Sequence, residues 1–78
     1  MYNMNYNDFI TILKNEKLNN ICFDKNNLLC NTVYLVKKDN DFLVYTTDER
    51  AVVFGKVRIF QNEEEAYINV LKRLRAFL

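Results

Sequence analysis

The two cysteines are the side chains of this sequence best suited to redox or metal chemistry. Cys22 and Cys30 stand eight positions apart, and the 78-residue chain contains no histidine. A structural zinc site needs about four ligands, usually cysteine thiolates and histidine nitrogens. We therefore expect no metal site and no cofactor, and we interpret both cysteines as reduced, partly buried thiols of a cytosolic protein.

The other familiar catalytic sets are also missing from the sequence. Without histidine, the commonest general base and the usual serine or cysteine triad cannot be assembled. Gly55 is the only glycine, which excludes a glycine-rich phosphate loop. Carboxylates are plentiful, but in a small domain such groups are usually solvated surface charge. The sequence therefore predicts a protein that is not an enzyme.

Acidic residues gather at three places along the chain. The groups are Asp39 with Asp41, Asp48 with Glu49, and the glutamates at 63–65. Lysines and arginines balance these acids to a net charge of +1, which gives no general field for nucleic acid or for a membrane surface. Local acidic projections instead suit a module that binds a basic surface on another protein, because complementary charge accelerates association and helps to fix register.

Three strand-like segments must position the first two acidic groups. The segments cover residues 32–38, 42–47 and 52–60, and their connectors are short and polar. The connector 39–41 has hairpin chemistry, because Asn and Asp tolerate positive φ and can bond their own backbone. The first two acidic groups should therefore project from turns.

The third segment has a mixed pattern. Val57 and Ile59 alternate with Lys56 and Arg58, which is typical of a strand with one face in water. Gly55 interrupts the alternation and predicts a bulge or a twist rather than a functional glycine.

Helical segments flank the strands. Residues 5–17 carry an apolar stripe, with Asn5 or Asn7 as the N-cap and the asparagines at 19–20 as terminator. A second helix begins at Asn62, which can cap it, and the glutamates at 63–65 suit its positive end. Glu65 stands where a capping-box partner would be. One face of this helix is apolar and consists of Tyr67, Val70, Leu71, Leu74, Phe77 and Leu78.

This order of elements predicts an α+β fold, a two-layer sandwich α-β-β-β-α with an antiparallel three-stranded meander. A single domain covers residues 1–78, in which residues 21–31 form a loop or a brief extended piece. A domain of this size buries only about 60% of its unfolded surface, which leaves room for a homodimer. The N-terminal residues carry no export signal, and no apolar run approaches the roughly 20 residues of a membrane span. We therefore expect a cytoplasmic protein without membrane partners.

The same element order is that of the double-stranded RNA-binding domain, so a small RNA-binding module is the alternative. Those domains place lysines at the start of the second helix, where they meet phosphates. Here glutamates at 63–65 occupy that place and would repel phosphate, whereas Lys72, Arg73 and Arg75 lie at the other end. We interpret these cations as a solvated helix face matched to the dipole, so direct nucleic-acid binding is disfavoured.

Residues 32–75 of the chain resemble small immunity proteins of bacterial polymorphic toxin and contact-dependent growth inhibition systems. The resemblance is carried by two strands, an acidic turn, a later aromatic residue and an acid-rich helix start, at 33–36, 43–45, 48–50, Phe60 and 63–66. Ala51 stands where that family has a glycine. The resemblance implies a cytoplasmic inhibitor that binds one cognate toxin. Many such toxins are nucleases with basic, phosphate-binding active sites, which an acidic inhibitor surface would occupy.

The predicted partner is therefore a cognate toxin domain, a basic nuclease. The candidate contact residues share a position in a turn or at a helix start, and they are Asp39, Asp41, Asp48, Glu49, Glu63 and Glu64. Tyr45 would add an aromatic anchor. For the glutamates we expect capping and dipole stabilisation as the main role and contact as a second one. Arg50 is expected to form an internal ion pair with a neighbour of Glu49.

Overall fold

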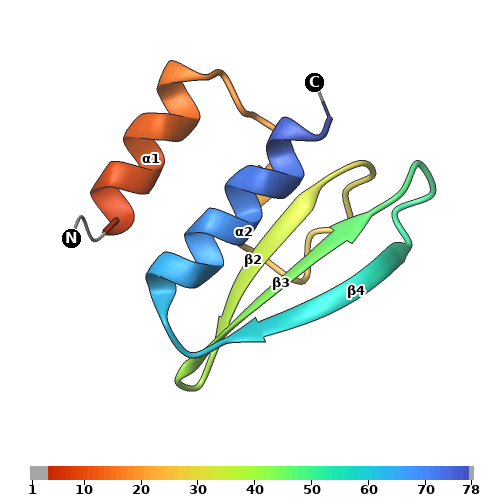
Figure 1. The fold of residues 1–78 in the computed structure, drawn as a ribbon. Helices are drawn as coiled ribbons and strands as arrows, with labels where there is room; N and C mark the ends of the chain where they lie inside the picture. Colours follow the sequence, from red (N-terminus) through yellow and green to blue (C-terminus); the bar gives the residue numbers. More distant parts are fainter. Residues whose placement is uncertain (1–3, 78) are drawn as a thin grey trace.

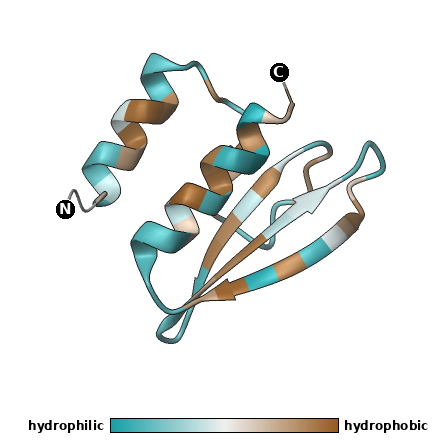
Figure 2. Cartoon of the chain, in the orientation of Figure 1, coloured by the Kyte–Doolittle hydropathy of each residue, from teal (hydrophilic) through white to brown (hydrophobic). Residues whose placement is uncertain are grey.

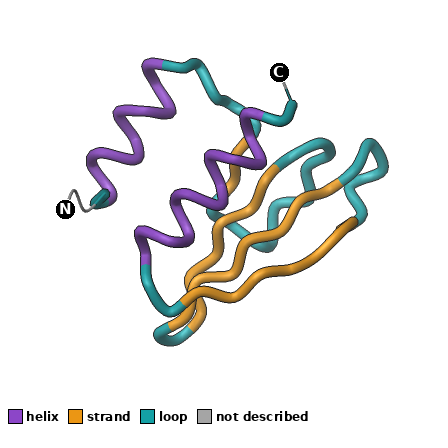
Figure 3. The backbone as a smooth tube through the Cα atoms, viewed as in Figure 1, coloured by secondary structure: helices purple, strands orange, loops and turns teal. Residues whose placement is uncertain are grey.

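Two helices and a four-stranded sheet form two layers in the computed structural model, which describes residues 4–77 (Figure 1). The elements in chain order are α1 (Tyr6–Asn15), β1 (Ile21–Cys22), β2 (Val33–Lys38), β3 (Asp41–Thr47), β4 (Val53–Phe60) and α2 (Glu63–Arg75). Both helices lie on the same side of the sheet (Figures 1 and 3). The predicted α+β sandwich is therefore confirmed.

The sheet has the strand order β1-β2-β3-β4. The meander β2-β3-β4 is antiparallel, as predicted, while β1 pairs parallel to β2 through Ile21 opposite Val33. This short fourth strand lies in the segment for which we expected a loop or a brief extended piece. It was not identifiable as a strand because two residues carry no alternation that could be read from the sequence.

Helix α1 begins and ends through local hydrogen bonds. The Asn5 Oδ1 accepts from the Asp8 amide at 2.8 Å, and the Asp8 carboxylate accepts from the Asn5 amide at 3.2 Å, which forms a capping box. At the other end Lys17 has φ 56°, and the Leu18 amide donates to the Leu13 carbonyl at 2.9 Å. This is the Schellman arrangement. The predicted end at Lys17 and the predicted asparagine terminator are thus wrong, because the chain turns two to three residues earlier.

Helix α2 is capped by Asn62, as predicted, with its Oδ1 accepting from the amides of Glu64 and Glu65. Its apolar face packs on β2 and β3, and Phe9 of α1 stacks on Tyr67 with ring centroids 4.5 Å apart. Of the predicted apolar face, Phe77 follows the helix and is exposed, and Leu78 lies outside the described residues. The core therefore lies between α2, α1 and the central strands.

The segment between β1 and β2 covers part of the helix-free face of the sheet. The Tyr34 hydroxyl donates to the Asn27 carbonyl and accepts from the Leu29 amide. The Thr47 hydroxyl donates to the Leu29 carbonyl at 2.7 Å. Within this region Cys22 is buried and Cys30 is exposed, and both are free thiols. The expectation of two partly buried thiols therefore holds for Cys22 and is wrong for Cys30, which lies in the exposed part of the segment.

Strand β4 departs most from its prediction. The alternation had indicated one buried face and one face in water. All residues of the strand are exposed except Phe60, which is half-buried, so neither face is covered. The register places Arg58 opposite Val44 on the helix side and Ile59 opposite Leu43 on the helix-free side. Ile59 therefore faces away from the helices, whereas Phe60, opposite Phe42, packs against the helix-side core. Helix α2 lies over β2 and β3, and apolar and polar residues alternate along the edge strand β4 (Figures 1 and 2).

Gly55 marks an irregularity in β4, as predicted. The pairing with β3 shifts register between Val44 and Thr46, opposite this part of β4. Gly55 has φ +73°, and a Cβ at this position would meet nothing within 4 Å. The glycine is therefore explained by its backbone conformation and not by a lack of space.

Candidate protein-binding surfaces

Two of the three acidic groups come together at one end of the sheet. The β2–β3 hairpin carries Asp39 and Asp41, and the pairing of Phe42 with Phe60 brings the end of β4 to the same end. Helix α2 then starts with Glu63 (Figure 1). We call Asp39, Asp41, Glu63 and Glu64 the acidic end. The hairpin also carries Lys37 and Lys38, so this end of the sheet has charges of both signs with an excess of acids.

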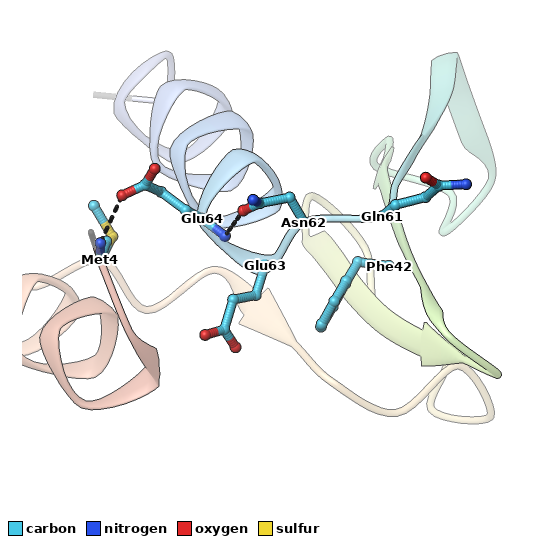
Figure 4. A pocket seen from close by; sticks show the side chains of 6 residues that line it. All are labelled: Met4, Phe42, Gln61, Asn62, Glu63 and Glu64. Carbon is cyan, nitrogen blue, oxygen red and sulfur yellow. Dashed lines mark hydrogen bonds between the residues drawn. The ribbon is translucent and has the colours of Figure 1, made fainter. Parts of the chain in front are cut away.

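The acidic end contains an open cavity of about 440 Å³ lined by Met4, Phe42, Gln61, Asn62, Glu63 and Glu64. The Glu64 Oε2 accepts from the Met4 amide at 2.7 Å, which ties the N-terminal segment to α2. Figure 4 shows the carboxylates of Glu63 and Glu64 pointing to different sides of the helix start. Glu64 is thus held by the chain itself.

The carboxylate of Glu63 has a contact on the helix. Its Oε2 accepts from the Tyr67 hydroxyl at 3.3 Å. Desolvation first, and then the charge of Glu63, raise the pKa of Tyr67 to about 12, so the phenol keeps its proton at neutral pH. A protonated phenol donor holds the Glu63 carboxylate at the rim of the acidic end.

The third acidic group, Asp48 with Glu49, lies in the turn between β3 and β4, at the opposite end of the sheet (Figure 1). Asp48 organises this turn, because its Oδ1 accepts from the Val52 amide at 3.1 Å and the Arg50 amide at 2.8 Å. These bonds lower the pKa of the Asp48 carboxyl, with a smaller contribution from the Arg50 charge. The structure therefore does not bring Asp48 and Glu49 together with the other predicted contact residues.

Arg50 forms the predicted internal ion pair. Its guanidinium lies 3.8 Å from the Asp48 carboxylate, and both side chains keep solvent exposure, so the pair contributes little to stability. The next residue, Ala51, has φ 60°. Ala51 thus adopts the left-handed conformation that a glycine at this position would adopt without strain.

Tyr45 lies on the helix-free face and is half-buried. Its ring stacks on Tyr34 with centroids 4.9 Å apart and an interplanar angle of 7°. Desolvation, and then the neighbouring Tyr34 phenol, raise the pKa of Tyr45. The tyrosine lines a shallow cavity of about 310 Å³ together with Val36, Leu43 and the hairpin lysines. The predicted aromatic anchor therefore belongs to a different face from the acidic end.

Two of the cations weighed for RNA binding donate to protein groups. The Arg73 guanidinium donates to the Thr46 hydroxyl at 3.0 Å and to the Lys56 carbonyl at 2.9 Å. Arg75 forms a bidentate pair with Glu16, with N–O distances of 2.6 and 2.9 Å. These contacts fasten α2 to the sheet and to the end of α1. Lys72 and Arg75 are exposed, and Arg73 is half-buried.

The exposure of Lys56 and Arg58 was expected from the predicted water-facing side of this strand, but the exposure of its apolar residues and of the neighbouring flank of α2 was not. Lys56, Val57, Arg58 and Ile59 are all exposed, as is Ile68 on the helix. One signal for them is present in the sequence, since the last strand of a meander lies at an edge of its sheet. The extent of helix cover over that edge is not readable from local pattern.

Two further properties concern ligands and membranes. Within residues 4–77, no three Cys, Asp or Glu side chains form a group that could hold a metal ion. Neither helix of the described chain is long and apolar enough to cross a membrane.

Comparison with known proteins gave no relative. A scan against protein-family models, a search of curated proteins and a search of solved structures each found no match for this chain.

Proposed function

We propose that this protein is a non-enzymatic immunity protein that binds a cognate bacterial toxin, a nuclease domain, and occludes its substrate site through the acidic end. The observation that carries the proposal is that the hairpin with Asp39 and Asp41 lies at the same end of the sheet as the start of α2 with Glu63 and Glu64. The two groups are 22 positions apart in sequence, from Asp41 to Glu63. A nuclease site that holds phosphate is basic, so such an end complements it.

Charge distribution supports this orientation of the complex. The helix starts carry Asp8 and the glutamates at 63–65, whereas the last turns carry Lys14, Lys72, Arg73 and Arg75. Negative charge therefore gathers at the helix starts and positive charge at the helix ends, although the net charge is only +1. A basic partner would be steered to the acidic end, and this effect would weaken as salt is added.

The proposal ranks the acidic end above the Asp48–Glu49 turn. Asp48 is engaged in hydrogen bonds that shape its own turn, which accounts for an acid at that position without a partner. Asp39 and Asp41 have no comparable bonds among the side-chain hydrogen bonds of residues 4–77. Two carboxylates on a hairpin tip are free to meet a partner's guanidinium or ammonium groups.

Co-expression with the product of the adjacent upstream gene tests the function. We expect that product to be toxic alone and harmless beside this chain. If it is not toxic, or remains toxic in the presence of this protein, the immunity function is contradicted.

A matched pair of variants tests the surface. The variant Asp39→Asn with Asp41→Asn removes two charges at the acidic end, and asparagine tolerates the φ of 56° at position 39. The control Asp24→Asn with Glu49→Gln removes two charges elsewhere. We expect the first variant to lose protection against the toxin and the control to keep it. Equal protection by both would place the contact elsewhere.

No observation favours the RNA-binding alternative, since Arg73 and Arg75 donate to protein acceptors. A gel shift with duplex RNA at low salt tests it. The absence of a shift at micromolar protein would remove this function.

A further inference from the structure

Strand β4 presents an unpaired edge of unusual length for so small a sheet. It is the last strand in the order β1-β2-β3-β4, and it contains eight residues, whereas β1 at the other edge contains two. Within residues 4–77 no segment pairs with its outer side. An exposed edge of this kind is a template for a further strand, because its outward N–H and C=O groups need partners.

The two faces of this edge differ in chemistry. Ile59 is 63% exposed on the helix-free side, where Leu43 continues the apolar surface, and Val57, two residues earlier in the strand, is 49% exposed. Lys56 and Arg58 alternate with them and are also exposed. A strand added here would meet apolar side chains on one face and positive charge on the other.

A groove between β4 and α2 widens the charged side of the edge. This groove has a volume of about 530 Å³ and is lined by Arg58, Ile59, Phe60, Glu65, Ile68, Asn69 and Lys72. Ile68 is 53% exposed, and the Arg58 guanidinium lies over the Phe60 ring at 5.5 Å. The groove thus offers Arg58 and Lys72 to an anion and Ile68 to an apolar contact, with Glu65 as its single acid.

Self-pairing is disfavoured by the same cations. Two copies of β4 pairing antiparallel about a two-fold axis would have a residue opposite itself at the centre. The two registers with the longest overlap, centred on Lys56 or Val57, each place a cation opposite a cation. Like charges directly opposite destabilise a strand pair. Self-pairing in these two registers is therefore destabilised, while the edge remains open to a strand of opposite charge.

From these observations we infer that β4 docks an extended segment of a partner protein in which acidic residues alternate with apolar ones. The acidic side chains would lie opposite Lys56 and Arg58 and reach Lys72. The apolar side chains would lie opposite Val57 and Ile59. The segment would add a fifth strand to the sheet along roughly the five residues 56–60, the end of β4 where the pairing with β3 resumes at Arg58 after the Gly55 irregularity. This inference rests on β4 and its groove and does not depend on the proposed immunity function.

The test is an NMR titration of the uniformly ¹⁵N-labelled full chain with a blocked seven-residue peptide of alternating valine and glutamate. We expect amide shifts concentrated at residues 53–60 and 65–72, with affinity that falls as salt is added. A peptide of alternating valine and lysine should bind at least about ten-fold more weakly, since it repeats the charge of the edge.

Two charge-matched variants complete the experiment. Lys56→Glu with Arg58→Glu should weaken the glutamate peptide about ten-fold and strengthen the lysine peptide, whereas Lys14→Glu with Lys25→Glu should do neither. The Arg58→Glu change should not prevent folding, because the positive charge of Arg58 repels that of Arg73 and a glutamate at position 58 would attract it. Three results would overturn the inference: no shifts at millimolar peptide, equal losses in both variants, or a homodimer in sedimentation whose β4 amides are protected.

Discussion

The turn after β3 provides a sensitive test of the backbone geometry, through the substitution Ala51→Gly. Ala51 has φ 60°, and its amide donates to the Asp48 carbonyl at 3.0 Å. Holding an L-residue in this conformation costs about 1–2 kcal/mol. Glycine removes that cost but loses about 0.5–1 kcal/mol more chain entropy on folding. The net expectation is a free energy of unfolding that is higher by about 0.5–1 kcal/mol.

Thermal unfolding followed by circular dichroism measures this gain. For a domain of this size, 1 kcal/mol corresponds to about 4–8 °C, so Ala51→Gly should raise the melting temperature by about 2–8 °C. Ala76→Gly is the matched control, because Ala76 has right-handed φ and ψ of −71° and −16°. There the same substitution should lower stability by up to about 1 kcal/mol. A lower melting temperature for Ala51→Gly, or equal effects of the two substitutions, would refute the left-handed turn.

Three further predictions concern single contacts. Lys17→Gly should raise the free energy of unfolding by about 0.5–1 kcal/mol in a urea titration, because Lys17 also has positive φ, and no gain would contradict the Schellman end of α1. Arg73→Met should cost about 1–2 kcal/mol and speed hydrogen exchange in β4, since it removes the bonds to Thr46 and to the Lys56 carbonyl; unchanged exchange would mean that those bonds do not hold the edge. Because folding lowers the pKa of Asp48, the stability that its carboxylate contributes is present above the unfolded pKa and is lost as the pH falls through the folded pKa. Asp48→Asn should therefore flatten the decline of the urea midpoint between about pH 5 and pH 2. An unchanged decline would contradict this role of Asp48.

The strand boundaries were predictable because they depend on local chemistry. Two apolar segments separated by the Asp–Asn connector placed β2 and β3 within one residue of their observed bounds. Asn62 as the cap of α2 and the irregular Gly55 follow from the same kind of signal. The end of α1 was misplaced because Lys17 adopts a conformation for which asparagine or glycine is preferred.

The candidate surfaces were only partly predictable, since they depend on pairing across the sheet. The position of Asp41 at the same end of the sheet as the start of α2 follows from the Phe42–Phe60 register, which no local pattern encodes. The exposure of Ile59 follows from its register with Leu43, which turns it to the face of the sheet that carries no helix. An alternating strand was therefore correctly recognised while its environment was not.

Hydrogen exchange of the complex with the upstream gene's product tests the central proposal most directly. The acidic end predicts slowed exchange of backbone amides at residues 38–42 and 61–65 on binding. The turn at 48–51 serves as the internal reference, because Asp48 and Glu49 lie at the opposite end of the sheet. Protection confined to 48–51, or no protection at either end, would contradict binding through Asp39, Asp41, Glu63 and Glu64.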